Sequence, residues 1–234
     1  YDAYYGIWWD FSAGAHDWMH SNAFHFDEEE STIYFSSRHL SRITKIDYPS
    51  GEIIWMIGLP NEFEGSESEH ICTDLGITWQ HNVQLLENGN ILLFDNGNLS
   101  ELFGDDRPTT RALEFKVIDN SVCEIVWEYT LPDYLYGPWM GSVQKLDNSN
   151  YFINTVGSGG HAVEVDENQN LVLDAHYLLA EDSNDFAGNY RSYKIPSIHP
   201  NAYSVIFKDY ITDNMEEGIY FVDSINIFIS NESG

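Results

Sequence analysis

Two histidines and one arginine have side chains that could carry out group transfer. His20 and His81 are imidazoles, which with an ordinary pKa near ~6.5 can serve as a nucleophile or a base at neutral pH. Arg38 follows His20 by 18 residues, and a guanidinium offers a planar fork of donors that matches the oxygens of a sulfuryl or phosphoryl group. These three residues are therefore the candidate catalytic groups.

The elements around these residues are expected to be short antiparallel strands. Runs of β-branched and aromatic residues separated by turn residues such as Ser50-Gly51 predict a meander. Its strands are expected at residues 32–35, 43–46 and 53–57. In a meander the polar groups at strand ends and in the preceding loops gather at one rim. His20, just before the first strand, and Arg38, just after the next, can therefore face one point.

The segment around His20 is repeated along the chain. Asn22-Ala-Phe-His-Phe-Asp is echoed 60 residues later by Asn82-Val-Gln-Leu-Leu-Glu and, more weakly, after another 60 by Ser142-Val-Gln-Lys-Leu-Asp. Repeats of this length predict an all-β fold, a β-propeller of four-stranded antiparallel blades with almost no helix. His20 and His81 both stand at the start of a blade's first strand, so we expect them at the same end of the propeller, near its axis.

The repeats also predict the domain organisation. Residues 1–205 are expected to form a partial β-propeller of three blades and part of a fourth. Residues 206–234 are expected to be its last strands or the start of a following β domain. The first residues have the character of the interior of a longer protein, so the chain is interpreted as a fragment. An open propeller exposes sheet faces and edges, so we expect the missing propeller half, or a second copy of the chain, to complete it.

The charge of the chain limits its partners. It has 10 Lys plus Arg against 38 Asp plus Glu, a net charge of −28. Nucleic acids and anionic membrane surfaces need clustered cations, so we exclude both as partners. No apolar run approaches the roughly 20 residues of a membrane span. The acidic residues are expected to form a solvated surface, and an anionic substrate would need local cations, which makes the few arginines informative.

The two cysteines, Cys72 and Cys123, are too few for a disulfide scaffold. Their pairing cannot be read from the sequence. Two buried free thiols are favoured over a bridge.

Six further residues are candidates for binding the substrate or supporting the catalytic groups: His39, Asn22, Asp95, Asn96, Trp18 and Trp79. His39 adjoins Arg38 and is expected to orient a neighbour rather than to react. Asp95-Asn96-Gly97 is first of all a turn after a buried strand, although its closeness to His81 in the same repeat leaves a supporting role open. Trp18 and Trp79 could stack on an aromatic ring, but packing in a sheet core is the commoner use of tryptophan.

Metal and glycoside chemistry are weaker interpretations. His20 and His81 with Asp17 or Asp95 could bind zinc, but Arg38 would oppose a cation. We therefore expect no metal and no cofactor. Glycoside hydrolysis requires two facing carboxylates, and acidic residues are so abundant here that the sequence leaves this chemistry open.

Four short motifs, taken together, resemble those of a known family. They are Asp17-Trp-Met-His20-Ser-Asn22, Ser36-Ser37-Arg38-His39, Gln80-His81 and Phe94-Asp95-Asn96-Gly97. In their order, and in the step from His20 to Arg38, they resemble the bacterial arylsulfate sulfotransferases that use no nucleotide sulfate donor. Asn189-Tyr-Arg191 is similar to the C-terminal segment of that family. The resemblance covers roughly residues 15–195, and it rests on the joint occurrence of the motifs.

This resemblance implies a six-bladed propeller, periplasmic or secreted, that moves a sulfuryl group from a phenolic sulfate ester to a phenol by a ping-pong route. His81 matches the histidine that becomes transiently sulfated. His20 and Arg38 match groups that bind and stabilise the sulfuryl oxygens. The family has a further active-site histidine in an earlier blade, and this chain starts after that blade, so the 234 residues alone are not expected to be active. The alternative is a non-catalytic propeller that serves as a binding or adhesion module of a secreted protein.

Overall fold

The computed structural model of the chain describes residues 8–10, 15–64, 69–177 and 188–195, and four short strands beyond residue 202. The chain divides into two compact units, residues 1–193 and 194–234. The boundary predicted from the sequence, after residue 205, falls within β16 (Tyr203–Phe207), which pairs with β19 (Ile227–Asn231). In the same unit β17 (Tyr210–Ile211) pairs with β18 (Tyr220–Phe221).

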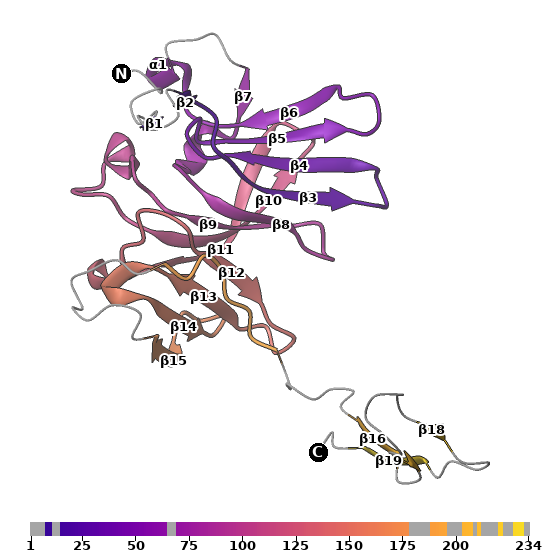
Figure 1. Cartoon of the computed structure of the whole chain (residues 1–234). Coiled ribbons are helices and arrows are strands. Elements are labelled where there is room, and N and C mark those ends of the chain that lie inside the picture. Colours follow the sequence, from indigo (N-terminus) through magenta and orange to yellow (C-terminus); the bar gives the residue numbers. More distant parts are fainter. Residues whose placement is uncertain are drawn as a thin grey trace. The chain divides into compact units, whose positions relative to one another are not determined.

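The first large sheet is an antiparallel meander followed by one short parallel strand (Figure 1). Its strands are β3 (Ser21–Asp27), β4 (Thr32–Ser37), β5 (Arg42–Asp47), β6 (Ile53–Ile57) and the parallel β7 (His70–Ile71). From Thr32 to Ser36, fully buried side chains alternate with half-buried ones, as expected for a strand with one face against a core. The meander predicted for this segment is confirmed.

The second and third large sheets are both four-stranded and antiparallel, with strands in sequence order (Figure 1). The second contains β8 (His81–Leu85), β9 (Ile91–Asp95), β10 (Arg111–Ile118) and β11 (Val122–Thr130). The third contains β12 (Ser142–Lys145), β13 (Tyr151–Thr155), β14 (His161–Val165) and β15 (Leu171–His176). All five residues of β9 are buried, as expected for a strand whose sheet has another sheet on each side.

The first strands of the three sheets are neighbours, and apolar cores fill the spaces between the sheets. β8 contacts both β3 and β12. Because successive side chains of a strand point to opposite faces, Leu93 and Phe94 of β9 enter different cores. Leu93 packs with Ile43 of the first sheet, and Phe94 packs with Ile153 of the third. Four-stranded antiparallel sheets stacked face to face in this way are blades of a β-propeller, so the predicted fold class is confirmed.

Helix is scarce in the described part of the chain. α1 (Asn61–Glu64) is a single turn, and four 3-10 turns connect strands: η1 (Thr73–Leu75), η2 (Ser100–Phe103), η3 (Asp133–Leu135) and η4 (Gly157–Gly159). Among the described residues, no helix has the length and apolar character needed to cross a membrane. Near the N-terminus the short strand β1 (Trp8–Asp10) pairs with β2 (Ala15–Asp17), which ends at the residue that opens the His20 motif.

The two cysteines form a disulfide, so the expectation of two free thiols is wrong. Cys72 and Cys123 have Cα atoms 5.4 Å apart and are separated by 51 residues. Cys72 lies just after β7, beside the first sheet, whereas Cys123 lies on β11, the outermost strand of the second. The bridge therefore joins two blades. The sequence could not show it because only folding brings the two segments together.

The disulfide should contribute substantially to stability. Closing a loop of this length restricts the unfolded chain. We therefore expect the free energy of unfolding of the Cys72→Ser/Cys123→Ser variant to be about 2–4 kcal/mol lower than that of the unchanged protein. Urea unfolding followed by tryptophan fluorescence measures this difference. Reducing agent should lower the stability of the unchanged protein and leave the double variant unaffected. Equal midpoints for both proteins would show that the bridge does not stabilise the fold.

Candidate functional site

The first strand of each of the three sheets is preceded by a residue with a left-handed backbone conformation. These residues lie at one end of the blades. His20 (φ 50°), Trp79 (φ 58°) and Met140 (φ 55°) precede β3, β8 and β12. A residue other than glycine in this conformation costs roughly 1–2 kcal/mol, and such residues persist where surrounding contacts hold them. Here the backbone N–H groups of Arg38 and His39 donate to the carbonyl oxygens of His20 and Met19, each at 3.2 Å. The end of β4 is thereby held beside the start of β3.

His81, the first residue of β8, has one ring nitrogen fixed by Asn96. The amide nitrogen of Asn96 donates to the carbonyl oxygens of Gly137 at 2.7 Å and Met140 at 3.0 Å. The amide oxygen of Asn96 must therefore face His81, whose Nδ1 lies 2.6 Å away. An amide oxygen only accepts, so Nδ1 carries the proton and Nε2 carries the lone pair. This is the tautomer that a nucleophile needs.

Burial keeps this ring neutral. His81 is only 2% exposed, and burial lowers its pKa to about 3, against the opposing effect of the bond to Asn96. Electrostatic interactions with Arg38, His20 and Arg191 lower the pKa further. These three groups are thus within electrostatic reach of His81. The imidazole of His81 is uncharged at neutral pH, and the guanidiniums of Arg38 and Arg191 favour this neutral form.

The lowered pKa of His81 predicts a pH dependence of stability. Between pH 6.5 and about pH 3, the unfolded chain binds a proton at His81 and the folded chain does not. Stability contributed in this way is full above pH 6.5 and falls by up to about 1.4 kcal/mol per pH unit as the pH is lowered. We expect His81→Asn to lose stability less steeply than the unchanged protein when urea unfolding is compared at about pH 7 and pH 4.5. Parallel losses would contradict the pKa shift.

Arg38 lies just after β4 and is 4% exposed. Its Nη2 donates to the carbonyl oxygen of Pro138 at 2.8 Å, and its guanidinium lies 4.2 Å from the ring centre of Trp79. Burial lowers the pKa of Arg38 to about 10, so the group remains a cation at neutral pH. Arg38 thus links the first blade to the loop before the third, and Trp79 serves as its platform.

His20, Asp17 and His39 form a second cluster beside Arg38. Nδ1 of His20 contacts Oδ2 of Asp17, and the rings of His20 and His39 are stacked with centroids 4.6 Å apart. Nδ1 of His39 lies 2.6 Å from the carbonyl oxygen of Asp17 and donates to it. Burial lowers the pKa of His39, which keeps this ring neutral. His39 therefore lies against the ring of His20, and its predicted role of orienting a neighbour stays a prediction.

The donor atoms of this cluster lie within 4.8 Å of one another, close enough to hold a metal ion. The positive charge of Arg38 acts on both Asp17 and His39, however. A metal cation would be repelled by that guanidinium and would have to displace the Asp17–His20 contact. We therefore assign no metal to it.

A segment that the sequence did not single out as part of the site also contributes to it. Residues 188–193, here called the closing segment, lie along the third blade: the N–H of Gly141 donates to the carbonyl oxygen of Tyr190 at 3.1 Å. The same segment reaches the first blade, where Nη2 of Arg191 donates to the carbonyl oxygen of Asn22 at 2.7 Å. Tyr190 lies edge-on to His81 with ring centroids 6.0 Å apart. Only the likeness of Asn189-Tyr-Arg191 to a family motif could have indicated this role.

Three N–H groups at the site are buried without a partner among the described residues. They are Nε of Arg38, Nε of Arg191 and Nε1 of Trp79. Unsatisfied buried donors are uncommon and often indicate a missing ligand, ion or water. An anion with several oxygens would satisfy donors of this kind. The site is therefore suited to a sulfuryl or phosphoryl group.

The remaining candidates from the sequence are placed differently. Asn22 donates from Nδ2 to the carbonyl oxygen of Gln80 at 2.7 Å and so joins the first two blades. The carboxylate of Asp95 accepts hydrogen bonds from Nε of Arg111 at 2.9 Å and from the N–H groups of Thr78 and Gly97. It therefore supports the turn and does not face His81. Trp18 is 50% exposed and stacks on no ring among the described residues.

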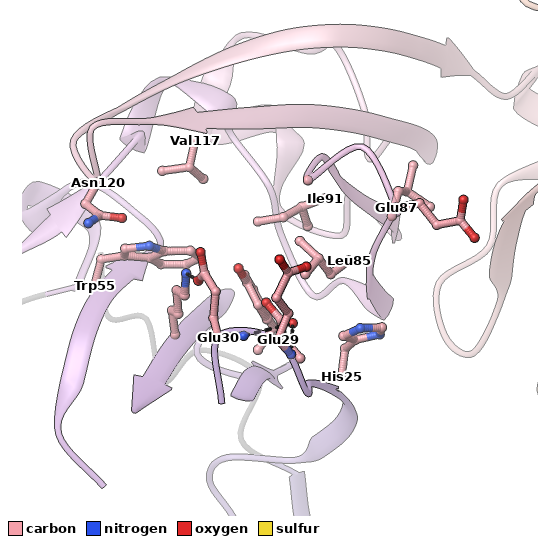
Figure 2. A pocket seen from close by; sticks show the side chains of 14 residues that line it. His25, Glu29, Glu30, Trp55, Leu85, Glu87, Ile91, Val117 and Asn120 are labelled. Carbon is pink, nitrogen blue, oxygen red and sulfur yellow. Dashed lines mark hydrogen bonds and ion pairs between the residues drawn. The ribbon is translucent and has the colours of Figure 1, made fainter. Parts of the chain in front are cut away.

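A cavity of about 600 Å³ lies at the opposite ends of the same strands, and Figure 2 shows the side chains that line it. β3 runs from the His20 end to Asp27, and β8 runs from His81 to Leu85, so the residues lining this cavity are far along each strand. Its carboxylates are Asp27, Glu29, Glu30 and Glu87, and Glu30 already accepts a bond from Lys45 at 2.5 Å. The cavity and the anion site are therefore separate, because they lie at opposite ends of β3 and β8. The carboxylates of the cavity would also repel an anion.

The inner ends of these propeller blades thus carry a neutral histidine, His81, within electrostatic reach of the guanidiniums of Arg38 and Arg191, an arrangement that can receive an anionic group. The profile of the arylsulfotransferase (ASST) family matches residues 9–195. The chain belongs to this arylsulfotransferase family. No curated protein matches the sequence.

Three solved structures show a distant likeness to the chain. A protein of unknown function from Bacteroides caccae is 14% identical, with a TM-score of 0.44 over 70% of this chain and 51% of its own. The H270A virginiamycin B lyase from Staphylococcus aureus, solved with quinupristin, is 10% identical, with a TM-score of 0.42 over 72% and 44%. A streptogramin B lyase is 13% identical, with a TM-score of 0.40 over 67% and 40%. The chain spans about half or less of the length of these structures.

Proposed function

We propose that the protein containing this chain transfers a sulfuryl group from a phenolic sulfate ester to a phenol through a sulfohistidine at His81. The observation that supports this most directly is the state of His81, a neutral ring whose lone pair is on Nε2. It lies within reach of two guanidiniums that have unpartnered donors. Membership of the arylsulfotransferase family supports the same reaction class.

In the first half-reaction, Nε2 of His81 forms a bond to sulfur and the bond from sulfur to the aryl oxygen breaks. The electron pair of that bond leaves with the oxygen. In the second half-reaction the oxygen of a phenol attacks sulfur, and the electron pair of the sulfur–nitrogen bond returns to Nε2. Two easier transfers replace one difficult transfer, and Arg38 and Arg191 stabilise charge on the sulfuryl oxygens.

The site requires cations because the rest of the chain is acidic. With a net charge of −28, the protein as a whole repels an anionic aryl sulfate, and the two guanidiniums provide local compensation. We also propose that the protein works in the periplasm or outside the cell. The disulfide between Cys72 and Cys123 supports this location, since disulfides persist mainly in oxidising compartments.

The test is to trap the intermediate on the full-length protein. A single turnover with an aryl sulfate labelled in its sulfuryl group should place the label on the peptide that contains His81. The nitrogen–sulfur bond is acid-labile, so digestion has to be carried out at alkaline pH, and only a blank result under those conditions counts. Label on another residue, or binding of the donor with no transfer, would refute the mechanism. The latter result would favour the non-catalytic binding module.

A further inference from the structure

The imidazole of His20 is held in place on two sides. Asp17 contacts its Nδ1, and the ring of His39 stacks on it at an interplanar angle of 30°. His39 is itself fixed by Asp17, through the 2.6 Å bond from its Nδ1 to the carbonyl oxygen. The side chain of His20 nevertheless remains 42% exposed. It is thus oriented but still accessible to a substrate.

We propose that His20 is the catalytic acid and base that exchanges a proton with the aryl oxygen, and that Asp17 is the residue that positions it. This role rests on the function proposed above and differs from the binding of sulfuryl oxygens that the family resemblance implies. The contact with Asp17 occupies Nδ1, so Nε2 is the nitrogen that exchanges the proton.

The geometry of the other groups explains why a separate proton carrier is needed. His81 cannot serve, because Nε2 bonds to sulfur and the Nδ1 proton is held by Asn96. His39 is buried, and its Nδ1 proton is held by the carbonyl oxygen of Asp17. Arg38 is needed as a permanent cation and is anchored to Pro138. His20 is a histidine within electrostatic reach of His81 that is both accessible and paired with a carboxylate.

The proton balance closes over the two half-reactions. When the bond from sulfur to the aryl oxygen breaks, the oxygen takes the electron pair and accepts the proton from Nε2 of His20. The ring of His20 is then neutral. The acceptor phenol next gives its proton to Nε2 of His20 while its oxygen forms the bond to sulfur. His81 recovers its lone pair and His20 its proton, so no additional reactant is consumed.

The experiment compares aryl sulfate donors whose leaving groups differ in basicity. For phenyl sulfate, whose phenolate is strongly basic, His20→Gln and Asp17→Asn should lower kcat/KM by about 10²-fold or more, within the range typical of general acid catalysis. For 4-nitrophenyl sulfate, whose phenolate leaves without help, the same variants should lose roughly tenfold or less. A merely structural defect would not depend on the leaving group. The full-length protein should be used throughout.

Matched controls come from the other end of β3. His25→Gln and Asp27→Asn change the same residue types near the separate acidic cavity, and both should transfer from the two donors as the unchanged protein does. If His20→Gln does not fold, as judged by circular dichroism, Asp17→Asn alone decides. Equal losses with both donors would overturn the acid–base role while leaving the proposed function intact. Absence of transfer by the unchanged protein from either donor would overturn the proposed function and this role with it.

Discussion

Replacing His81 with alanine in the full-length protein should abolish sulfuryl transfer, with a loss on the order of 10⁴-fold or more. The reason is that neither water nor a neighbouring side chain can reproduce a nitrogen lone pair fixed by Asn96 at 2.6 Å. The measurement is the release of 4-nitrophenol from its sulfate ester in the presence of a phenol acceptor. Label from the donor should also disappear from the protein.

A second variant separates loss of the nucleophile from loss of the fold. His81→Asn fits a site that is only 2% exposed with a smaller side chain that still presents polar atoms toward Asn96. We expect it to keep the circular dichroism spectrum and cooperative unfolding of the unchanged protein while remaining inactive. Full turnover by His81→Ala would dismiss a covalent role for this histidine and favour a binding module.

Arg38→Lys should also impair the reaction severely, although it keeps the positive charge. The guanidinium of Arg38 donates from Nη2 to Pro138 and has Nε still unpartnered, so one planar group can hold the loop and meet a sulfuryl oxygen at once. An ammonium is a point charge that cannot reproduce this fork. We expect kcat/KM to fall by about 10²–10³-fold, as when a donor to a developing oxyanion is removed. Steady-state kinetics with an aryl sulfate donor measures the loss.

The matched control for this variant is Arg107→Lys. Arg107 contacts Asp133 at the surface, with 61% of its side chain exposed, and surface ion pairs contribute little. It should retain full activity. If the kcat/KM of Arg38→Lys equalled that of Arg107→Lys, the planar geometry of the Arg38 guanidinium would be irrelevant to the reaction.

The sequence allowed the fold to be predicted because the relevant signals are local. Alternation of side chains and a 60-residue repeat indicate where the inner strands begin, and three such strands start at residues 21, 81 and 142. His20, Arg38 and His81 could be placed at one end for the same reason. Cys72 and Cys123 could not be paired, because nothing in their spacing of 51 residues specifies contact.

Two parts of the site lay beyond such reasoning. Asp95 and Asn96 are adjacent, yet the first accepts from Arg111 and the second from His81, because neighbouring residues at a strand end point to opposite sides. A motif that treats Asp95 and Asn96 as a unit cannot distinguish the residue that supports the turn from the residue that contacts His81. Arg191 was missed as a site residue because its contact with Asn22 spans 169 residues.

The distance in sequence between Arg191 and Asn22 also orders events during biosynthesis. Polypeptides emerge N-terminus first at roughly 5–20 residues per second, so the closing segment leaves the ribosome roughly 10–30 seconds after Asn22. The segments that carry Arg38 and His81 are therefore made before the second guanidinium, and this order holds whether the blades fold during synthesis or after export. Arg191 can reach Asn22 only after the whole third blade has been made. The anion site is thus the last part of these blades that can form.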